Sequence, residues 1–117
     1  MAEVTVYHNP ACGTSRNVLG FIRNAGIEPN IIEYLETPPD RGTLVALIQK
    51  MQVPVRDVVR QKEPLYAELA LHQASDEAVL DAMLTHPQLI NRPIVVTPRG
   101  VKLCRPLENV LDLLPPQ

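Results

Sequence analysis

The segment that most constrains the fold is a strand, a helix and a second strand that follow one another within the first 35 residues. Residues 4–7 are β-branched and aromatic and end at the turn signal Asn9-Pro10. Apolar residues then recur at helical spacing over residues 14–25, and Gly26 stands where a glycine ends a helix. Residues 30–35 have the composition of a second strand. So short a crossover favours parallel pairing with a right-handed connection, and the sequence therefore predicts an α/β fold.

The middle third of the chain predicts a block of helices over approximately residues 38–90. Asp40 and Ser75 are residue types that cap helices, and an apolar helical pattern follows each of them. Pro54 fits the first position of a further short helix, where proline costs no backbone hydrogen bond, and Pro64 interrupts the chain before residues 65–69. We therefore expect this block to be all-helical.

The last third predicts a hairpin and a final helix. Residues 93–97 and 101–104 have the composition of short strands, and the tight turn at residues 98–100 should pair them antiparallel. Pro106 then fits the first position of a helix that carries apolar residues at helical spacing. The predicted order is strand, helix, strand, helical block, strand, strand, helix.

Length and composition limit the class of protein. The 117 residues fit one domain over residues 1–117, and 45% hydrophobic with 21% charged residues is ordinary for a globular protein. No apolar run is long enough for a bilayer, and the first residues do not resemble a secretory signal, so we expect a cytoplasmic protein with no membrane partner. A net charge of -2 argues against nucleic-acid binding. The sequence bears little on oligomeric state, and we expect a monomer.

Cys12 is the leading candidate for chemistry because it lies in the turn between the first strand and the first helix. Backbone N–H groups at a helix N-terminus lack helical partners and favour a negative charge, which stabilises a thiolate. The alternative is a small, buried and inert cysteine. The second cysteine, Cys104, is far along the chain and in no metal-like spacing, so no metal site is expected. The sequence leaves a disulfide between the two cysteines open.

Four motifs, together with the order of elements, resemble the glutaredoxin-coupled arsenate reductase family of the thioredoxin superfamily. They are YHNPACGTSRN at residues 7–17, YLETPP at 34–39, NRPIVVTP at 91–98 and LCRP at 103–106. The likeness runs over nearly the whole chain. It implies a thioredoxin-like mixed sheet of about four strands, with the helical insertion between its βαβ and ββα halves. It also implies reduction of arsenate to arsenite with glutathione as co-substrate and glutaredoxin as partner, without a bound cofactor.

The resemblance also implies roles for individual residues. Cys12 corresponds to the family's nucleophile, His8 to a group that lowers the thiol's pKa, and Ser15 to a hydrogen-bond donor to sulfur. The three substrate-binding arginines correspond to Arg60, Arg92 and Arg105. Eight of the eleven lysine and arginine residues are arginine, whose planar fork suits tetrahedral oxyanions. A cis-proline is implied at Pro93.

Several of these residues also have ordinary explanations. Arg60 could form an exposed ion pair with Glu63 three residues later. His8 fits a hydrogen-bonded core histidine. Arg92 and Arg105 fit surface arginines, although each adjoins a predicted strand, which would let both converge on the end of the sheet near the thiol.

The absence of a second motif cysteine decides what else the site would need. Ser15 stands where a Cys-x-x-Cys motif would place its resolving thiol, so an intermediate on Cys12 needs an external thiol. Two other functions remain open. One is a glutathione-dependent thiol oxidoreductase that acts on another substrate. The other is a redox-responsive regulator that binds RNA polymerase, which the missing cysteine pair and the lack of a basic excess disfavour.

Overall fold

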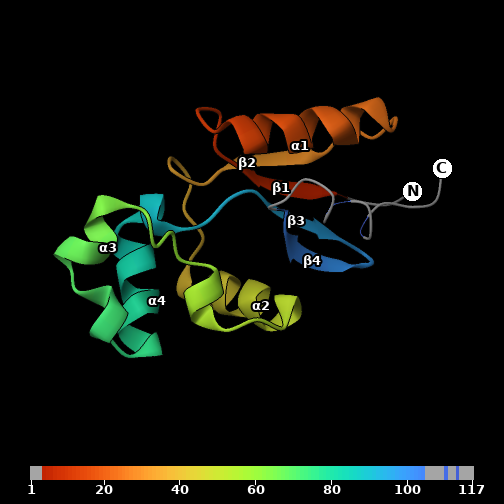
Figure 1. Cartoon of the computed structure of the whole chain (residues 1–117). Helices are drawn as coiled ribbons and strands as arrows, with labels where there is room; N and C mark the ends of the chain where they lie inside the picture. The colour runs from red at the N-terminus through yellow and green to blue at the C-terminus, as the bar shows by residue number, and fades with distance from the viewer. Residues whose placement is uncertain (1–3, 105–109, 111–112, 114–117) are drawn as a thin grey trace. The chain divides into compact units, whose positions relative to one another are not determined.

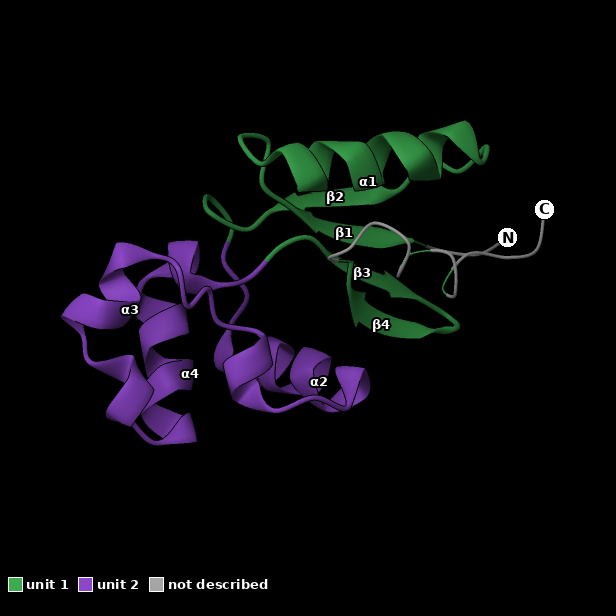
Figure 2. Ribbon diagram, in the orientation of Figure 1, with its two compact units in different colours: residues 1–37, 92–117 green, residues 38–91 purple. Residues whose placement is uncertain are grey.

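A computed structural model of the protein describes residues 4–104, 110 and 113. The chain forms two compact units, residues 1–37 with 92–117 and residues 38–91 (Figure 2). The first unit carries the sheet and the second is mainly helical. That the two form a single domain over residues 1–117 stays a prediction.

In the described part of the chain, four strands form one mixed sheet in the order β2-β1-β3-β4 (Figure 1). They are β1 (Thr5–His8), β2 (Asn30–Glu33), β3 (Ile94–Thr97) and β4 (Gly100–Leu103). β1 pairs parallel with β2 and antiparallel with β3, and β3 pairs antiparallel with β4. The predicted α/β class, parallel first pair and C-terminal hairpin are confirmed. The second strand ends two residues earlier than predicted, because Glu36 and Thr37 turn back and donate to the carbonyl of Glu33.

Helix α1 (Gly13–Asn24) connects the two parallel strands. Its buried side is formed by Val18, Leu19 and Ile22, with Ser15 in the first turn. Gly26 has a φ of +83°, and its N–H donates to the Arg23 carbonyl at 3.0 Å. The predicted glycine stop is therefore confirmed, since a left-handed residue after the last turn satisfies otherwise open helix carbonyls.

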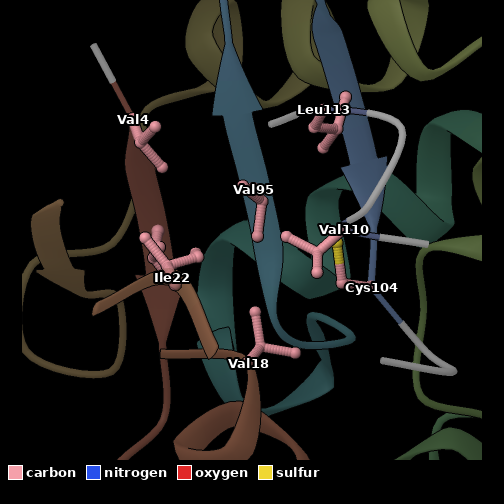
Figure 3. Close-up of a cluster of buried hydrophobic side chains, with 8 residues drawn as sticks. Val4, Val18, Ile22, Val95, Cys104, Val110 and Leu113 are labelled. Carbon is pink, nitrogen blue, oxygen red and sulfur yellow. The ribbon is translucent and has the colours of Figure 1, made fainter. Parts of the chain in front are cut away.

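A cluster of buried apolar side chains holds α1 to one face of the sheet. Figure 3 shows side chains from α1, β1, β3 and the segment after β4 pointing toward one another. Its members are Val4, Val6, Val18, Ile22, Val95, Cys104, Val110 and Leu113. Burial of these apolar side chains fixes α1 on the sheet. It also fixes the turn that precedes the helix.

The second unit consists of short helices. These are α2 (Arg41–Met51), α3 (Pro64–Glu68) and α4 (Asp76–Thr85), with the 3-10 turns η1 (Val55–Asp57), η2 (Leu71–Gln73) and η3 (Pro87–Leu89). Asp40 accepts from Thr43 N–H at 2.8 Å and Ser75 from Ala78 N–H at 3.2 Å. Both predicted caps are confirmed, because each side chain pairs one of the open N–H groups of its helix.

Two details differ from the predictions for this block and the C-terminus. The block is not wholly helical, because Val59 pairs with Ile90 in an isolated antiparallel bridge. Flanking backbone bonds of 2.7 Å, from Arg60 N–H to Leu89 and from Asn91 N–H to Val58, reinforce it. The predicted helix from Pro106 lies outside the described residues. Among the helices that the structure describes, none has the length and apolar character needed to cross a membrane.

We expect Ile22→Ala to lower the free energy of unfolding by about 3 kcal/mol, because Ile22 is completely buried in the cluster that holds α1. Denaturant unfolding followed by circular dichroism would measure this. Ile31→Ala on β2 is the matched control, since Ile31 is 37% exposed and should cost about 1 kcal/mol or less. Equal losses in both variants would contradict the importance of the cluster.

Candidate active site

Cys12 occupies the N-cap position of α1, at the end of a tight turn from β1. Its N–H donates to the Asn9 carbonyl at 3.0 Å, and its own carbonyl accepts from Arg16 N–H at 3.0 Å. The backbone of Cys12 is extended, with φ −95° and ψ 123°, as an N-cap residue requires. The cysteine therefore lies at the positive end of the helix dipole, and it is 8% exposed.

Two side chains fasten the loop between β1 and Cys12. Asn9 Oδ1 accepts from Ala11 N–H at 3.0 Å, which is an Asx turn. Arg16 Nη1 donates to the Pro10 carbonyl at 2.9 Å. Sequence reasoning named Asn9 only as part of a turn signal and gave Arg16 no role, although both stand in the motif at residues 7–17. Membership of that motif was the only feature of the sequence that could have pointed to their contacts in the turn.

His8 and Ser15 form a buried pair behind the turn. His8 Nδ1 lies 2.6 Å from Ser15 Oγ, and the same oxygen accepts from Asn9 N–H at 3.1 Å. Burial lowers the pKa of His8 below its usual 6.5; Glu33 opposes this effect, while Arg23 and Arg16 add to it. The imidazole is therefore neutral at pH 7. We assign its proton to Nε2, so that Nδ1 accepts the Ser15 hydroxyl proton.

The structure thus joins His8 and Ser15 directly and places both at the thiol turn. His8 is a buried, hydrogen-bonded histidine, as the alternative considered from the sequence described. Such a histidine can still act beside the thiol. The resolved partners of the Ser15 hydroxyl are His8 and Asn9, and its predicted bond to sulfur stays a prediction.

Arg92 lies at the same end of the sheet as the thiol turn. It directly precedes β3, and the first residue of that strand, Ile94, pairs with Tyr7 near the end of β1. The Arg92-Pro93 peptide bond is cis, which confirms the expectation for Pro93. Arg92 is partly buried. Its position fits the predicted role toward an anion held at Cys12.

For the other two predicted arginines, a position near the turn stays a prediction. Arg60 belongs to the helical unit, where its guanidinium lies 3.5 Å from the Glu63 carboxylate, so the ion pair considered from sequence exists. Both side chains are largely buried, with 25% and 21% of their surface exposed. Arg105 lies outside the described residues. Their substrate-binding roles stay predictions.

Cys104 differs sharply from Cys12. It is completely buried in the cluster beneath α1, and burial raises the pKa of its thiol to about 12. Both cysteines are free thiols. Among residues 4–104, 110 and 113, no three His, Cys, Asp or Glu side chains are grouped so as to hold a metal ion.

Comparison with known proteins identifies the family. The model of the ArsC family matches residues 7–113. The chain belongs to the ArsC family. Two curated ArsC relatives, the arsenate reductases of Rhizobium meliloti strain 1021 and Escherichia coli K12, are 60% and 57% identical to it. The first alignment covers 96% of this chain and 81% of the relative, and the second covers 98% and 83%.

A solved ArsC structure agrees with the fold. The arsenate reductase from Vibrio cholerae superimposes with a TM-score of 0.92 at 46% identity, over 96% of this chain and 98% of that one. The family resemblance and the thioredoxin-like fold expected from the sequence are thereby confirmed.

We expect iodoacetamide to modify Cys12 and to leave Cys104 intact in the folded protein at about pH 7.5, because only a thiolate reacts. Cys104 is both buried and protonated, with a pKa of about 12. Mass spectrometry of tryptic peptides would measure each site, with the unfolded protein as the control in which both react. Rapid modification of Cys104 in the native state would contradict this assignment.

We expect protonation of His8 to destabilise the fold. Its pKa is lower in the folded protein than the 6.5 of an unperturbed histidine, so the unfolded chain binds the proton first as the pH falls. The stability of the wild type should therefore decrease between about pH 8 and about pH 5.5 more than that of His8→Gln. Denaturant unfolding at both pH values tests the difference. An NMR titration midpoint for His8 above 6.5 would reverse the sign.

Proposed function

We propose that the protein is an arsenate reductase in which Cys12 attacks arsenate and an external thiol completes the reduction to arsenite. The observation that carries the proposal is the placement of Cys12 at the N-terminus of α1, in the turn backed by the His8–Ser15 pair and at the same sheet end as Arg92. The enzyme class is confirmed by relatives named arsenate reductase at 57–60% identity over nearly the whole chain.

The first step is nucleophilic attack. Arsenate at neutral pH is largely a dianion, so a thiolate that approaches it meets like-charge repulsion. Donors and positive charges already in place reduce that repulsion, and the helix N-terminus with Arg92 supports this role. A sulfur–arsenic bond forms as an arsenic–oxygen bond breaks, and the departing oxygen leaves as water after it takes up protons.

The second step transfers the electron pair. A second thiol attacks the intermediate, two thiols become one disulfide, and As(V) becomes As(III), which leaves as arsenite. We propose glutathione as this thiol and glutaredoxin as the protein that restores the reduced enzyme. The turn supports an external thiol, because the position three residues after Cys12 holds the completely buried Ser15.

The remaining arginines complete the proposed binding site for the oxyanion. Arg60 and Arg105 are assigned to it on the family motif, together with Arg92. Glu63 holds Arg60 within its own unit, which pre-orders a long side chain before any anion arrives. We further propose that the protein is cytoplasmic, because a reducing compartment keeps Cys12 as the free thiol that the mechanism needs. We also propose that it is a monomer.

We expect Cys12→Ser to abolish arsenite formation, and Arg92→Ala or Arg105→Ala to lower kcat/KM by about a hundredfold, as loss of an oxyanion donor does. The assay couples arsenate reduction through glutathione and glutaredoxin to NADPH oxidation by glutathione reductase. Arg99→Ala is the matched control, because Arg99 is exposed in the β3–β4 turn, at the sheet end opposite Cys12.

Activity retained in Cys12→Ser would disprove the mechanism. If the wild type forms a mixed disulfide with glutathione at Cys12 but does not turn over arsenate, the function is instead that of a thiol oxidoreductase with another substrate.

A further inference from the structure

The side chain of Arg16 folds back over the turn that carries Cys12. Nη1 donates to the Pro10 carbonyl at 2.9 Å, and Nη2 lies 3.9 Å from where a β-carbon on Gly13 would stand. The guanidinium therefore reaches from Pro10 toward Gly13, the residues on either side of the Ala11-Cys12 pair in the sequence. The backbone N–H of the same arginine donates to the Cys12 carbonyl at 3.0 Å. Arg16 thus binds the turn through both its main chain and its side chain.

The charge of Arg16 is not neutralised by a nearby carboxylate within the described residues. Four other arginines form ion pairs there, namely Arg23 with Glu28, Arg41 with Glu77 and Asp81, Arg56 with Asp76, and Arg60 with Glu63. For Arg16, the described part of the chain offers only the neutral Pro10 carbonyl as a side-chain partner. Its positive charge therefore lies against the turn without a carboxylate partner among the described residues.

We propose that Arg16 is a positioning residue for Cys12, which clamps the Pro10 carbonyl onto the first turn of α1 and holds a positive charge beside the thiolate. The proposal deepens the proposed function, because it rests on Cys12 as the nucleophile. It adds a fourth arginine to the chemistry, one that acts through the sulfur instead of binding the substrate.

Other ionisable groups also lie at this end of the sheet. His8 and Glu33 are paired across β1 and β2, and Arg92 precedes β3. His8 is neutral at pH 7, because burial lowers its pKa. By the sign of its charge, Glu33 would oppose a thiolate at Cys12 and Arg92 would favour one. The side chain of Arg16 is exposed, so water screens part of its effect. A moderate contribution is therefore expected, smaller than that of a buried cation.

The test is the rate of alkylation of Cys12 by iodoacetamide as a function of pH, at about 10 mM salt to limit screening. Arg16→Gln keeps a donor for the Pro10 carbonyl and removes the charge, whereas Arg16→Lys keeps the charge. We expect Arg16→Gln to raise the midpoint of the rate profile by about half to one pH unit, and Arg16→Lys to stay within about 0.2 of the wild type. Arg99→Gln removes the same charge at the far end of the sheet and should leave the midpoint unchanged.

Two results would overturn the proposal. One is an unchanged midpoint in Arg16→Gln. The other is an equal rise in Arg16→Gln and Arg99→Gln, which would assign the effect to net charge alone. Thermal melting identifies a variant that fails to fold. If Arg16→Gln does not fold, the alkylation midpoints of the wild type and of Arg16→Lys are compared at low and at high salt. A charge that acts on Cys12 loses its effect on the midpoint when salt screens it. Alkylation needs no arsenate, so a failure of the proposed function would appear as absent turnover with the Arg16 effect intact.

Discussion

The packing of α1 on the sheet is the interaction on which the rest of the structure depends. Valine and isoleucine side chains from α1, β1 and β3 meet in one buried cluster. Because β1 and β2 run parallel, the chain must return along the sheet between them, and α1 is that return. The cluster fixes the helix axis, so its N-terminus lies at the carboxyl end of β1. The position of Cys12 is therefore set by apolar packing on the side of α1 that faces the sheet.

The same cluster explains why the two cysteines differ. Cys104 contributes its thiol to the packed interior, where a thiolate would lose its hydration without gaining donors. Cys12 lies at the margin of that interior, at the N-terminus of α1, where open N–H groups favour an anion. One side-chain chemistry thus gives an inert core residue and a candidate nucleophile within the same unit. The two cysteines differ in how deeply each is buried and in whether open backbone N–H groups lie nearby, and neither property can be read from the number of cysteines in the sequence.

Local patterns predicted most of the fold, and long-range contacts account for what they missed. The helical period of α1, the caps Asp40 and Ser75, and the hairpin could be read from neighbouring residues, because each depends on interactions within a few positions. The bridge between Val59 and Ile90 could not, since it joins residues far apart in sequence. Periodicity did not assign His8 and Ser15 a shared role either, because their contact exists only once β1 and α1 are packed. The three predicted substrate-binding arginines were assigned by motif likeness alone, because they do not recur at any helical or strand period.

Ser15 shows how the fold limits the chemistry of the turn. Its side chain is completely buried, and its one oxygen interacts with both the His8 ring and the Asn9 N–H. A thiol at this position is a weak hydrogen-bond partner and has a larger sulfur atom, so it would disturb both bonds. The residue three positions after Cys12 therefore holds the turn and His8 in place. A site built in this way has a fixed, neutral imidazole behind the thiol and no cysteine three residues after Cys12. Under the proposed function, its electrons would therefore come from a second molecule.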